Sequence, residues 1–141
     1  MEFGELLKLF LLDLQRLFRS KIVDGEITLS QILLISCIPD ESIDMTSLAQ
    51  QIGVDNSTLT RLVDVLIRRD WVFKTKDTID KRITLLGLTQ KGEEIQNKIE
   101  DRIDYYGDMV YESIAVEDRD EVKEILSSFH WTLSKMLMKH E

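Results

Sequence analysis

Residues 48–66 read LAQQIGVDNSTLTRLVDVL, and this stretch decides the fold. Its apolar helical spacing stops at Gly53, a residue that adopts at little cost the left-handed backbone conformation that closes a helix. A second helical pattern begins after Asp55 or Asn56, either of which is a favoured N-cap. The break therefore predicts two short helices that cross at a steep angle over one shared core, as in a helix-turn-helix.

Two β-like runs follow the second helix. Residues 71–76 (WVFKTK) and 82–86 (RITLL) are rich in strand-forming residues, and a charged loop at 77–81 separates them. This pattern predicts a hairpin with a long polar tip. A helix-turn-helix followed by a hairpin is typical of a winged helix, whose second helix fits the major groove of DNA and whose wing reaches the adjacent minor groove or backbone.

The segments before this unit also have helical patterns. Residues 3–20 carry leucines and phenylalanines at steps of three and four, with an apolar stripe that extends almost all round the helix. Such a helix is normally buried between other elements or in a subunit interface. Thr28 and Gln31 have the spacing of a capping box for a short helix through Ser36, which we expect Pro39 to end.

Further polar residues predict where the remaining elements begin and end. Residues 39–44 are expected to form a polar loop, and Thr46 is expected to cap the helix that follows. Thr89 is expected to cap a long helix that runs to a joint at 115–117, and 118–138 has the pattern of a last helix. These end helices are too long for one small lobe to cover, so we expect their apolar faces to pack on each other and on a second subunit.

The predicted fold is mainly α with a small β-hairpin wing, a winged helix-turn-helix with N- and C-terminal dimerisation helices. We interpret residues 1–141 as a single domain. Within it, 28–90 form the DNA-binding lobe, and 1–21 with 91–141 form the helical dimerisation region.

The charge of the chain is uneven. The whole sequence has a net charge of −8, which is unfavourable for binding nucleic acid. Residues 61–82, however, carry seven Lys or Arg and four Asp, a net charge of +3. A basic segment on an acidic chain is a usable electrostatic footprint for DNA, although a solvated hairpin is the alternative interpretation.

The polar face of the second helix and the basic residues of the wing are candidates for DNA contact. Short hydroxyl side chains near a helix N-terminus bond phosphate oxygens, and Arg61 is long enough to reach a guanine edge with two hydrogen bonds. The candidate DNA-binding residues are Asn56, Ser57, Thr58, Thr60, Arg61, Arg68, Lys74, Lys76, Lys81 and Arg82.

Some of these residues also have purely structural interpretations. Ser57 and Thr58 are equally well explained as first-turn residues of a capped helix. Asp55 and Asn56 are favoured as caps rather than as base readers.

Two other charged residues in this segment are expected to have partners within the protein. Asp64 repels phosphate, so we expect it to pair with Arg61 or Arg68 at helical spacing. Arg69 is expected to face its own lobe.

Three stretches together resemble the multiple-antibiotic-resistance-regulator (MarR) family: MTSLAQQIGVDNSTLTRLVDVLIRRDWV (45–72), DKR (80–82) and LTQKG (88–92). The resemblance implies a homodimeric transcription regulator, a repressor, on a pseudopalindromic operator of double-stranded DNA. It also implies release by a small-molecule effector, for which no residues are assigned. By the same resemblance Arg82 enters the minor groove, and Asp80 orients it without touching DNA.

The sequence departs from the family pattern at two places. Asp70 stands where the family often has glycine, but aspartate tolerates the left-handed conformation better than most residues, so the turn is expected to survive. The wing tip has only Lys81 and Arg82 close together, where many relatives carry a stronger basic cluster. We therefore expect modest, salt-sensitive affinity for DNA.

The remaining chemistry-bearing residues indicate no second function. Cys37 is alone, which fits a reducing cytoplasm and is interpreted as a buried structural thiol. His130 and His140 have no second ligand pair in helical register, so neither a metal nor a cofactor is expected.

Other classes of protein are less well supported. We find no nucleophile–base pair and no phosphate loop, so an enzyme is not predicted. The apolar stretch at 6–14 is interrupted by charges and preceded by acidic residues, which excludes a signal peptide or membrane span. The alternative that stays open is a winged-helix dimeric adaptor that contacts proteins and binds no specific DNA.

Overall fold

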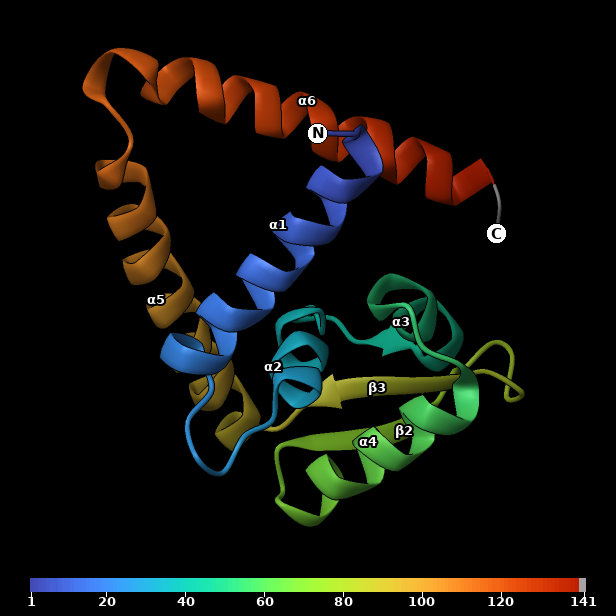
Figure 1. Ribbon diagram of the computed structural model, residues 1–141. Helices are drawn as coiled ribbons and strands as arrows, with labels where there is room; N and C mark the ends of the chain where they lie inside the picture. Colours follow the sequence, from blue (N-terminus) through green and yellow to red (C-terminus); the bar gives the residue numbers. More distant parts are fainter. Residues whose placement is uncertain (140–141) are drawn as a thin grey trace. The chain divides into compact units, whose positions relative to one another are not determined.

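The computed structural model describes residues 1–139, and Figure 1 shows their helices and the small sheet. This order of elements confirms the predicted mainly helical winged helix-turn-helix fold. In chain order the elements are α1 (Phe3–Leu17), the π-helical turn η1 (Phe18–Ile22), α2 (Leu29–Ser36), β1 (Ile43–Asp44), α3 (Met45–Ile52), α4 (Asn56–Arg68), β2 (Val72–Lys76), β3 (Thr84–Leu88), α5 (Gln90–Ser113), the 3-10 turn η2 (Val116–Asp118) and α6 (Arg119–Lys139).

The chain divides into two compact units. The first, Met1–Ile103, holds α1 to α4, the sheet and the first half of α5. The second, Asp104–Glu141, holds the rest of α5, η2 and α6 and is described as far as Lys139. The predicted boundaries of the lobe and of the dimerisation region stay predictions.

The core of the first unit lies where α2, α3 and α4 meet one another and the sheet. Each of these helices contributes the apolar stripe that its sequence spacing predicts, and β3 contributes a leucine from the sheet. The largest fully buried side chains are Ile32, Leu34, Ile35, Ile38, Leu48, Leu59, Leu66, Leu86 and Val63.

The sheet has three antiparallel strands in the order β1–β3–β2. Two details of the prediction are wrong. Residues 39–44 are not only a loop, because Ile43 and Asp44 form β1 and pair with Leu86 and Leu85 of β3. The second wing strand spans Thr84–Leu88 rather than 82–86, so residues 82 and 83 belong to the wing loop.

The caps of the first helices are partly as predicted. The capping box is confirmed, since the Gln31 N–H donates to Thr28 Oγ1 and the Thr28 N–H donates to Gln31 Oε1. Thr46 is wrong as the cap of α3: the cap is Asp44, whose carboxylate accepts hydrogen bonds from the backbone N–H and the hydroxyl of Ser47. Asp44 rather than Thr46 caps the helix because its place at the end of β1 gives it the extended backbone that an N-cap requires.

Two helix ends differ in detail from the prediction, and one agrees. The first helical segment does not stop at residue 20, because the π-helical turn η1 continues it to Ile22. The second helix ends at Ser36, before Pro39 can act as its stop. Gly53 ends α3 in the left-handed conformation, with a φ of 74°, as its position predicts.

The base of the wing is tied to α5 by the LTQKG motif. Asp70 has a φ of 62°, so the predicted left-handed turn survives without glycine. The Thr89 hydroxyl donates to the Asp70 carbonyl at 2.6 Å and accepts from the Gly92 N–H at 3.0 Å, which confirms Thr89 as the cap of α5. The Thr89 N–H donates to the Trp71 carbonyl at 3.0 Å. One threonine therefore joins the turn after α4 to the start of α5.

The first half of α5 is held to the first unit by two further side chains. The Gln96 amide donates to the carbonyls of Ile35 and Ile38, both at 2.8 Å, and so satisfies the C-terminal end of α2. Arg102 donates to the Ile22 carbonyl at the end of η1. These bonds fix the position of α5 relative to α2 and the α1–α2 connection.

Gly92 is required by this packing, and we expect Gly92→Ala to lower the free energy of unfolding by about 2 kcal/mol, the scale of an overpacked core. A Cβ there would lie 1.8 Å from the Trp71 carbonyl oxygen, a backbone atom with no room to retreat. The matched control is Gly107→Ala in the same helix, where nothing lies within 4 Å of the added Cβ. The control should gain about 1 kcal/mol from helix propensity. Equal urea midpoints for the two variants would contradict this assignment.

Candidate nucleic-acid interface

Helix α4 begins at a charged cap. Asp55 is the N-cap, and its carboxylate accepts the Thr58 N–H at 2.7 Å and the Ser57 hydroxyl at 2.9 Å. These bonds lower the pKa of Asp55, the Thr58 backbone N–H contributing most. Of the two predicted caps, Asp55 is therefore the one that acts, and Asn56 becomes the first residue of the helix.

The solvent-facing side of α4 carries the side chains that the sequence marks for DNA contact. Asn56, Ser57, Thr60, Arg61 and Arg68 are exposed, and Thr58 is half-buried. Two hydroxyls already have local partners, since Ser57 bonds to the cap and Thr60 Oγ1 donates to the Asn56 carbonyl. The Arg61 guanidinium donates a long 3.4 Å hydrogen bond to Thr58 Oγ1, and such a weak bond leaves the side chain able to extend from the helix.

The ion pair of Asp64 differs from the prediction. Among residues 1–139 its carboxylate pairs with Lys74 Nζ of β2 at 3.7 Å, not with Arg61 or Arg68. The reason is the sheet register, which sets Lys74 opposite Leu86 and on the side of β2 that faces α4. This ion pair joins α4 to β2 of the wing. It also partly neutralises Lys74, which the sequence marks for DNA contact.

The tip of the wing presents a constrained arginine. The Arg82 Nε and Nη2 atoms donate to the two carboxylate oxygens of Asp80, both at 3.1 Å, and the Arg82 N–H also donates to Asp80. The Arg82 side chain lowers the pKa of Asp80, and Asp80 raises that of Arg82. The Arg82 side chain is 91% exposed, so the two hydrogen bonds to Asp80 fix the direction of the guanidinium while it stays open to solvent.

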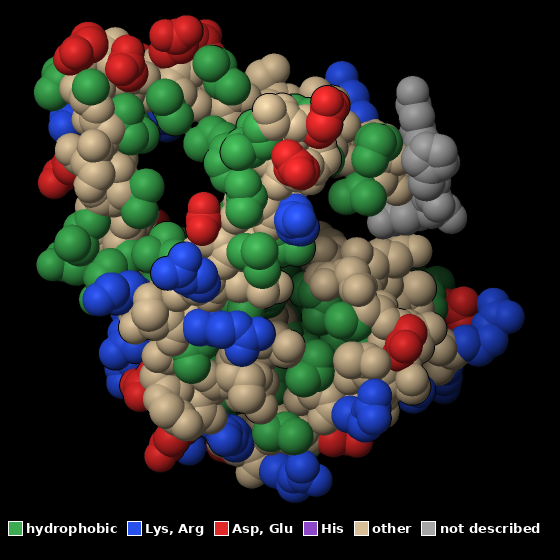
Figure 2. Space-filling model, in the orientation of Figure 1, with side chains coloured by type: hydrophobic (Ala, Val, Ile, Leu, Met, Phe, Trp, Pro, Cys, Tyr) green, Lys and Arg blue, Asp and Glu red, His purple; other side chains and the backbone are tan. Residues whose placement is uncertain are grey.

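The other wing lysines are placed less firmly. Lys76 Nζ donates to Thr84 Oγ1 across the hairpin at 3.0 Å, and Lys81 is exposed beside Arg82. Figure 1 shows the β2–β3 loop projecting from the sheet, and Figure 2 shows Lys and Arg side chains at its end. The structure thus brings the wing cations together at one protruding edge.

Arg69 faces its own lobe, as predicted. Its guanidinium donates to the Glu26 carbonyl at 2.7 Å and stacks over the Trp71 ring at 4.9 Å. Sequence reasoning assigned no anchoring role to Trp71, although an aromatic residue next to the turn at Asp70 is the signal that marks it. The buried indole secures the end of α4 against the α1–α2 connection.

Beside this anchor lies a cavity of about 430 Å³ in the first unit. Ile22, Ile27 and Ile99 contribute apolar walls, and Arg102 lies among the charged residues that line it. Trp71 also lines the cavity, and its Nε1 is buried without a hydrogen-bond partner. Among the described residues this indole N–H has no acceptor, so a water molecule or a ligand oxygen in the cavity can take it.

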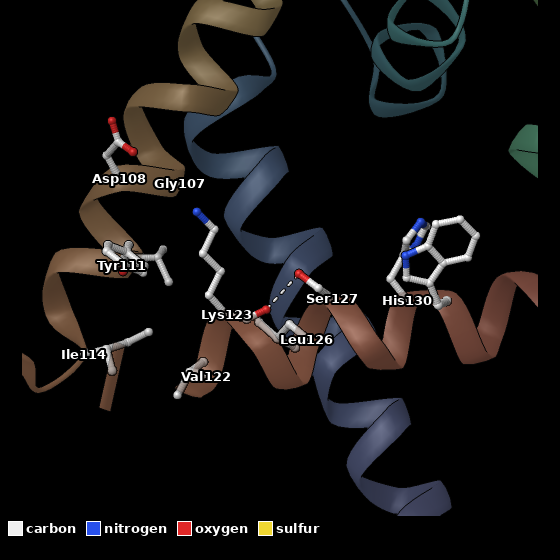
Figure 3. Close-up of a pocket in the computed structure, with 11 residues that line it drawn as sticks. Gly107, Asp108, Tyr111, Ile114, Val122, Lys123, Leu126, Ser127 and His130 are labelled. Atoms are coloured by element: carbon white, nitrogen blue, oxygen red, sulfur yellow. Dashed lines mark hydrogen bonds between the residues drawn. The ribbon is translucent and has the colours of Figure 1, made fainter. Parts of the chain in front are cut away.

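The second unit has an open apolar groove of about 700 Å³ between the end of α5 and α6 (Figure 3). Tyr111 and Ile114 line it from α5, and Val122 and Leu126 line it from α6. Trp131, also in the lining, is 64% exposed. An exposed apolar groove of this size is typical of an interaction site rather than of the ordinary solvent-facing surface of a monomer.

The remaining groups add no further site within the described residues. No cluster of three or more His, Cys, Asp or Glu among residues 1–139 is arranged to hold a metal ion, and His140 lies outside that range. Burial raises the pKa of the half-buried Cys37 thiol, with a smaller contribution from the charge of Glu100. None of the helices described is long and apolar enough to span a lipid bilayer.

The model of the MarR family matches residues 27–84, from the loop before α2 to the first residue of β3. The HTH-type transcriptional regulator SarZ of Staphylococcus epidermidis is 31% identical to this chain over 70 residues, which cover 50% of this chain and 47% of SarZ. SarZ of Staphylococcus aureus is 29% identical over 68 residues, or 48% and 46% of the two chains. The chain thus spans about half the length of the curated relatives it matches.

Solved structures extend the likeness to most of the chain. Wild-type apo MarR from E. coli has a TM-score of 0.80 at 21% identity and covers 92% of this chain and 96% of its own. A mutant MarR from E. coli complexed with operator DNA has a TM-score of 0.73 at 22% identity, over 89% and 91% of the two chains. At these identities the likeness shows the fold.

The Asp55 cap gives a pH-dependent prediction. Because the pKa of Asp55 is lowered in the folded chain, its stabilising contribution is present above the carboxyl pKa of the unfolded chain. It is lost as the pH falls through the lower, folded-state pKa. Asp55→Ala should therefore melt below the wild type at pH 7, and this gap in melting temperature should close in acid.

Asp55→Asn is the matched control, since an amide oxygen accepts the same hydrogen bonds without titrating in this range. Thermal unfolding followed by circular dichroism measures all three proteins. A gap between the wild type and Asp55→Ala that stays constant down the pH series would contradict the assigned role.

Proposed function

We propose that this chain, whose residues 27–84 form a MarR-family winged helix, is a sequence-specific DNA-binding transcriptional regulator. It acts in the cytoplasm as a homodimeric repressor on a pseudopalindromic operator. The observation that carries the proposal is that basic side chains lie on the exposed face of α4 and on the projecting wing, although the chain as a whole is acidic. The MarR structure with operator DNA, which has the same fold, supports it.

In this proposal α4 enters the major groove. Asn56, Ser57 and Thr58 stand at the helix N-terminus, where the positive end of the helix dipole and the first-turn N–H groups other than that of Thr58, which bonds to Asp55, favour phosphate. Arg61 reads a guanine edge, for which its weakly bonded guanidinium is available. Thr60 and Arg68, both exposed, lie within reach of the same groove and its backbone.

The wing occupies the neighbouring minor groove. Arg82 enters the groove, and Asp80 orients it through the two-pronged hydrogen bond. A fixed guanidinium loses less conformational entropy on binding than a free one. Lys76 and Lys81 contact phosphates, whereas Lys74 keeps its bond to Asp64 and positions the wing.

Dimerisation is supported by the uncovered apolar side chains of the terminal helices. No residue of α1 is buried among the described residues, although its sequence is largely apolar. In the second unit the groove between α5 and α6 is uncovered as well. A second copy of the chain covers both surfaces; the more exposed of their residues are Phe3, Phe10, Leu11, Leu14, Val110, Leu126 and Trp131.

Release by a small molecule is supported by the cavity beside Trp71. A ligand there would accept the indole N–H and touch the α1–α2 connection, which also holds Arg69 of the recognition helix. Binding would shift the population towards dimers whose two α4 helices do not match the spacing of the operator.

Selection of bound duplexes from a random pool tests the DNA-reading role. The wild type should enrich two half-sites about 10 bp apart, one helical turn. Arg61→Ala should relax base preference at one position per half-site by about 1–3 kcal/mol. Arg16→Ala, which removes an exposed arginine of α1, is the matched control and should keep the full preference. If the pool shows no enrichment at low salt, the adaptor function is favoured instead.

The dimer proposal is tested by sedimentation velocity at micromolar concentration. The wild type should run as a dimer, and Leu126→Glu should run as a monomer because it places a charge in the groove. Ser128→Glu adds the same charge to α6 outside the groove lining and should leave the dimer intact. A wild type that sediments as a monomer would contradict the proposal.

A further inference from the structure

The most exposed large apolar side chain among residues 1–139 is Ile79, at 94%. It lies in the wing loop between Asp77 and Asp80. Turns of this kind favour Gly, Asn, Asp or Ser, each of which helps the chain to reverse. A β-branched isoleucine does not stabilise such a turn, and no core lies within its reach, so its position is unexplained by folding.

The loop presents Ile79 in a defined place. The Ile79 N–H donates to the Asp77 carboxylate at 3.1 Å, and the Asp77 N–H donates to the Ile83 carbonyl at 3.0 Å. The Ile83 N–H in turn donates to the Asp80 carbonyl at 3.0 Å. Because Asp80 also holds Arg82, one network of hydrogen bonds sets the apolar side chain and the cation of the wing tip.

We infer that Ile79 is a second specificity-determining residue of the wing, which selects A·T base pairs by packing on the floor and sugar walls of the minor groove. This inference rests on the DNA-binding function proposed above. Ile79 precedes Arg82 by three residues in the same loop, so a wing that brings Arg82 to a minor groove also brings Ile79 there.

The chemistry of the groove gives the direction of the preference. An A·T pair presents only acceptor atoms on the minor-groove floor, whereas a G·C pair adds the 2-amino group of guanine. That amino group projects towards the incoming side chain and leaves a donor without an acceptor beside an apolar residue. Proteins that bind the minor groove do place apolar side chains such as Leu, Ile and Phe in it.

Ile79 and Arg82 respond to different properties of the same groove. Arg82 responds to the negative potential of a narrow groove. Ile79 responds to whether the 2-amino group is present. Replacing adenine by 2,6-diaminopurine in the flank adds this amino group to the minor groove and leaves the major-groove pattern of the base unchanged. The substitution therefore tests the proposed contact of Ile79.

The experiment measures the Kd of an operator selected by the wild type, by fluorescence anisotropy, with the wing-facing flanks as A·T or as diaminopurine·T pairs. The wild type should bind the diaminopurine flanks about tenfold more weakly, a loss of the size that one unfavourable base pair causes. Ile79→Ser should bind the A·T flanks about fivefold more weakly than the wild type and discriminate less than twofold between the two flanks.

Two controls keep the result interpretable. Ile79→Leu should restore the discrimination because it restores an apolar contact. Val116→Ser removes another exposed β-branched side chain, at 72% exposure, in the turn η2 of the second unit, and should behave as the wild type.

Two outcomes would overturn the inference while leaving the DNA-binding function intact. One is an Ile79→Ser variant that keeps the full response to diaminopurine, which would assign that response to Arg82. The other is a variant that loses affinity equally on both flanks. A wild type that selects no operator refutes the proposed function instead, so the two failures are distinguishable.

Discussion

The contact on which the arrangement depends is the approach of Gly92 to the carbonyl of Trp71, bridged by Thr89. It leaves no space for a side chain at the start of α5, and the Thr89 hydroxyl occupies the remaining position between Asp70 and Gly92. Recognition helix, wing and α5 meet at this point. This contact therefore ties the start of α5 to the base of the wing and to the turn after α4.

Electrostatics sets how the acidic chain can approach a polyanion. Asp64 and Asp80 each hold one wing cation, Lys74 and Arg82, so these two acidic groups act as positioning partners. Both pairs are at least partly exposed to solvent and contribute little to stability. Their use is directional, because they fix where a lysine and an arginine point. Of the candidate DNA-contacting cations, Lys74 and Arg82 are thus held in ion pairs, and the expected modest, salt-sensitive affinity stays a prediction.

Much of the fold can be predicted from local signals, because helix caps and breaks depend on neighbouring residues. Gly53, the capping box at Thr28 and the cap at Thr89 are of this kind. The Asp44 cap also has a local signal, its spacing of three from Ser47, which the choice of Thr46 overlooked. The strand at β1 and the pairing of Asp64 with Lys74 depend instead on which strands lie side by side. No local pattern encodes such a register, so these features emerge only from the folded chain.

The candidate site likewise has some features with a local sequence signal and others that depend on the folded structure. The exposed residues of α4 follow from helical periodicity, and an aromatic residue beside the turn at Asp70 marks Trp71, whereas the presentation of Ile79 depends on the hydrogen bonds of the folded wing loop. Hydroxyl-radical footprinting of the selected operator tests the central claim most directly, since it reports protected sugars along both minor grooves. We expect two symmetric zones of protection flanking the half-sites, both absent with Arg82→Ala. A footprint that is missing, one-sided or unaffected by that substitution would contradict it.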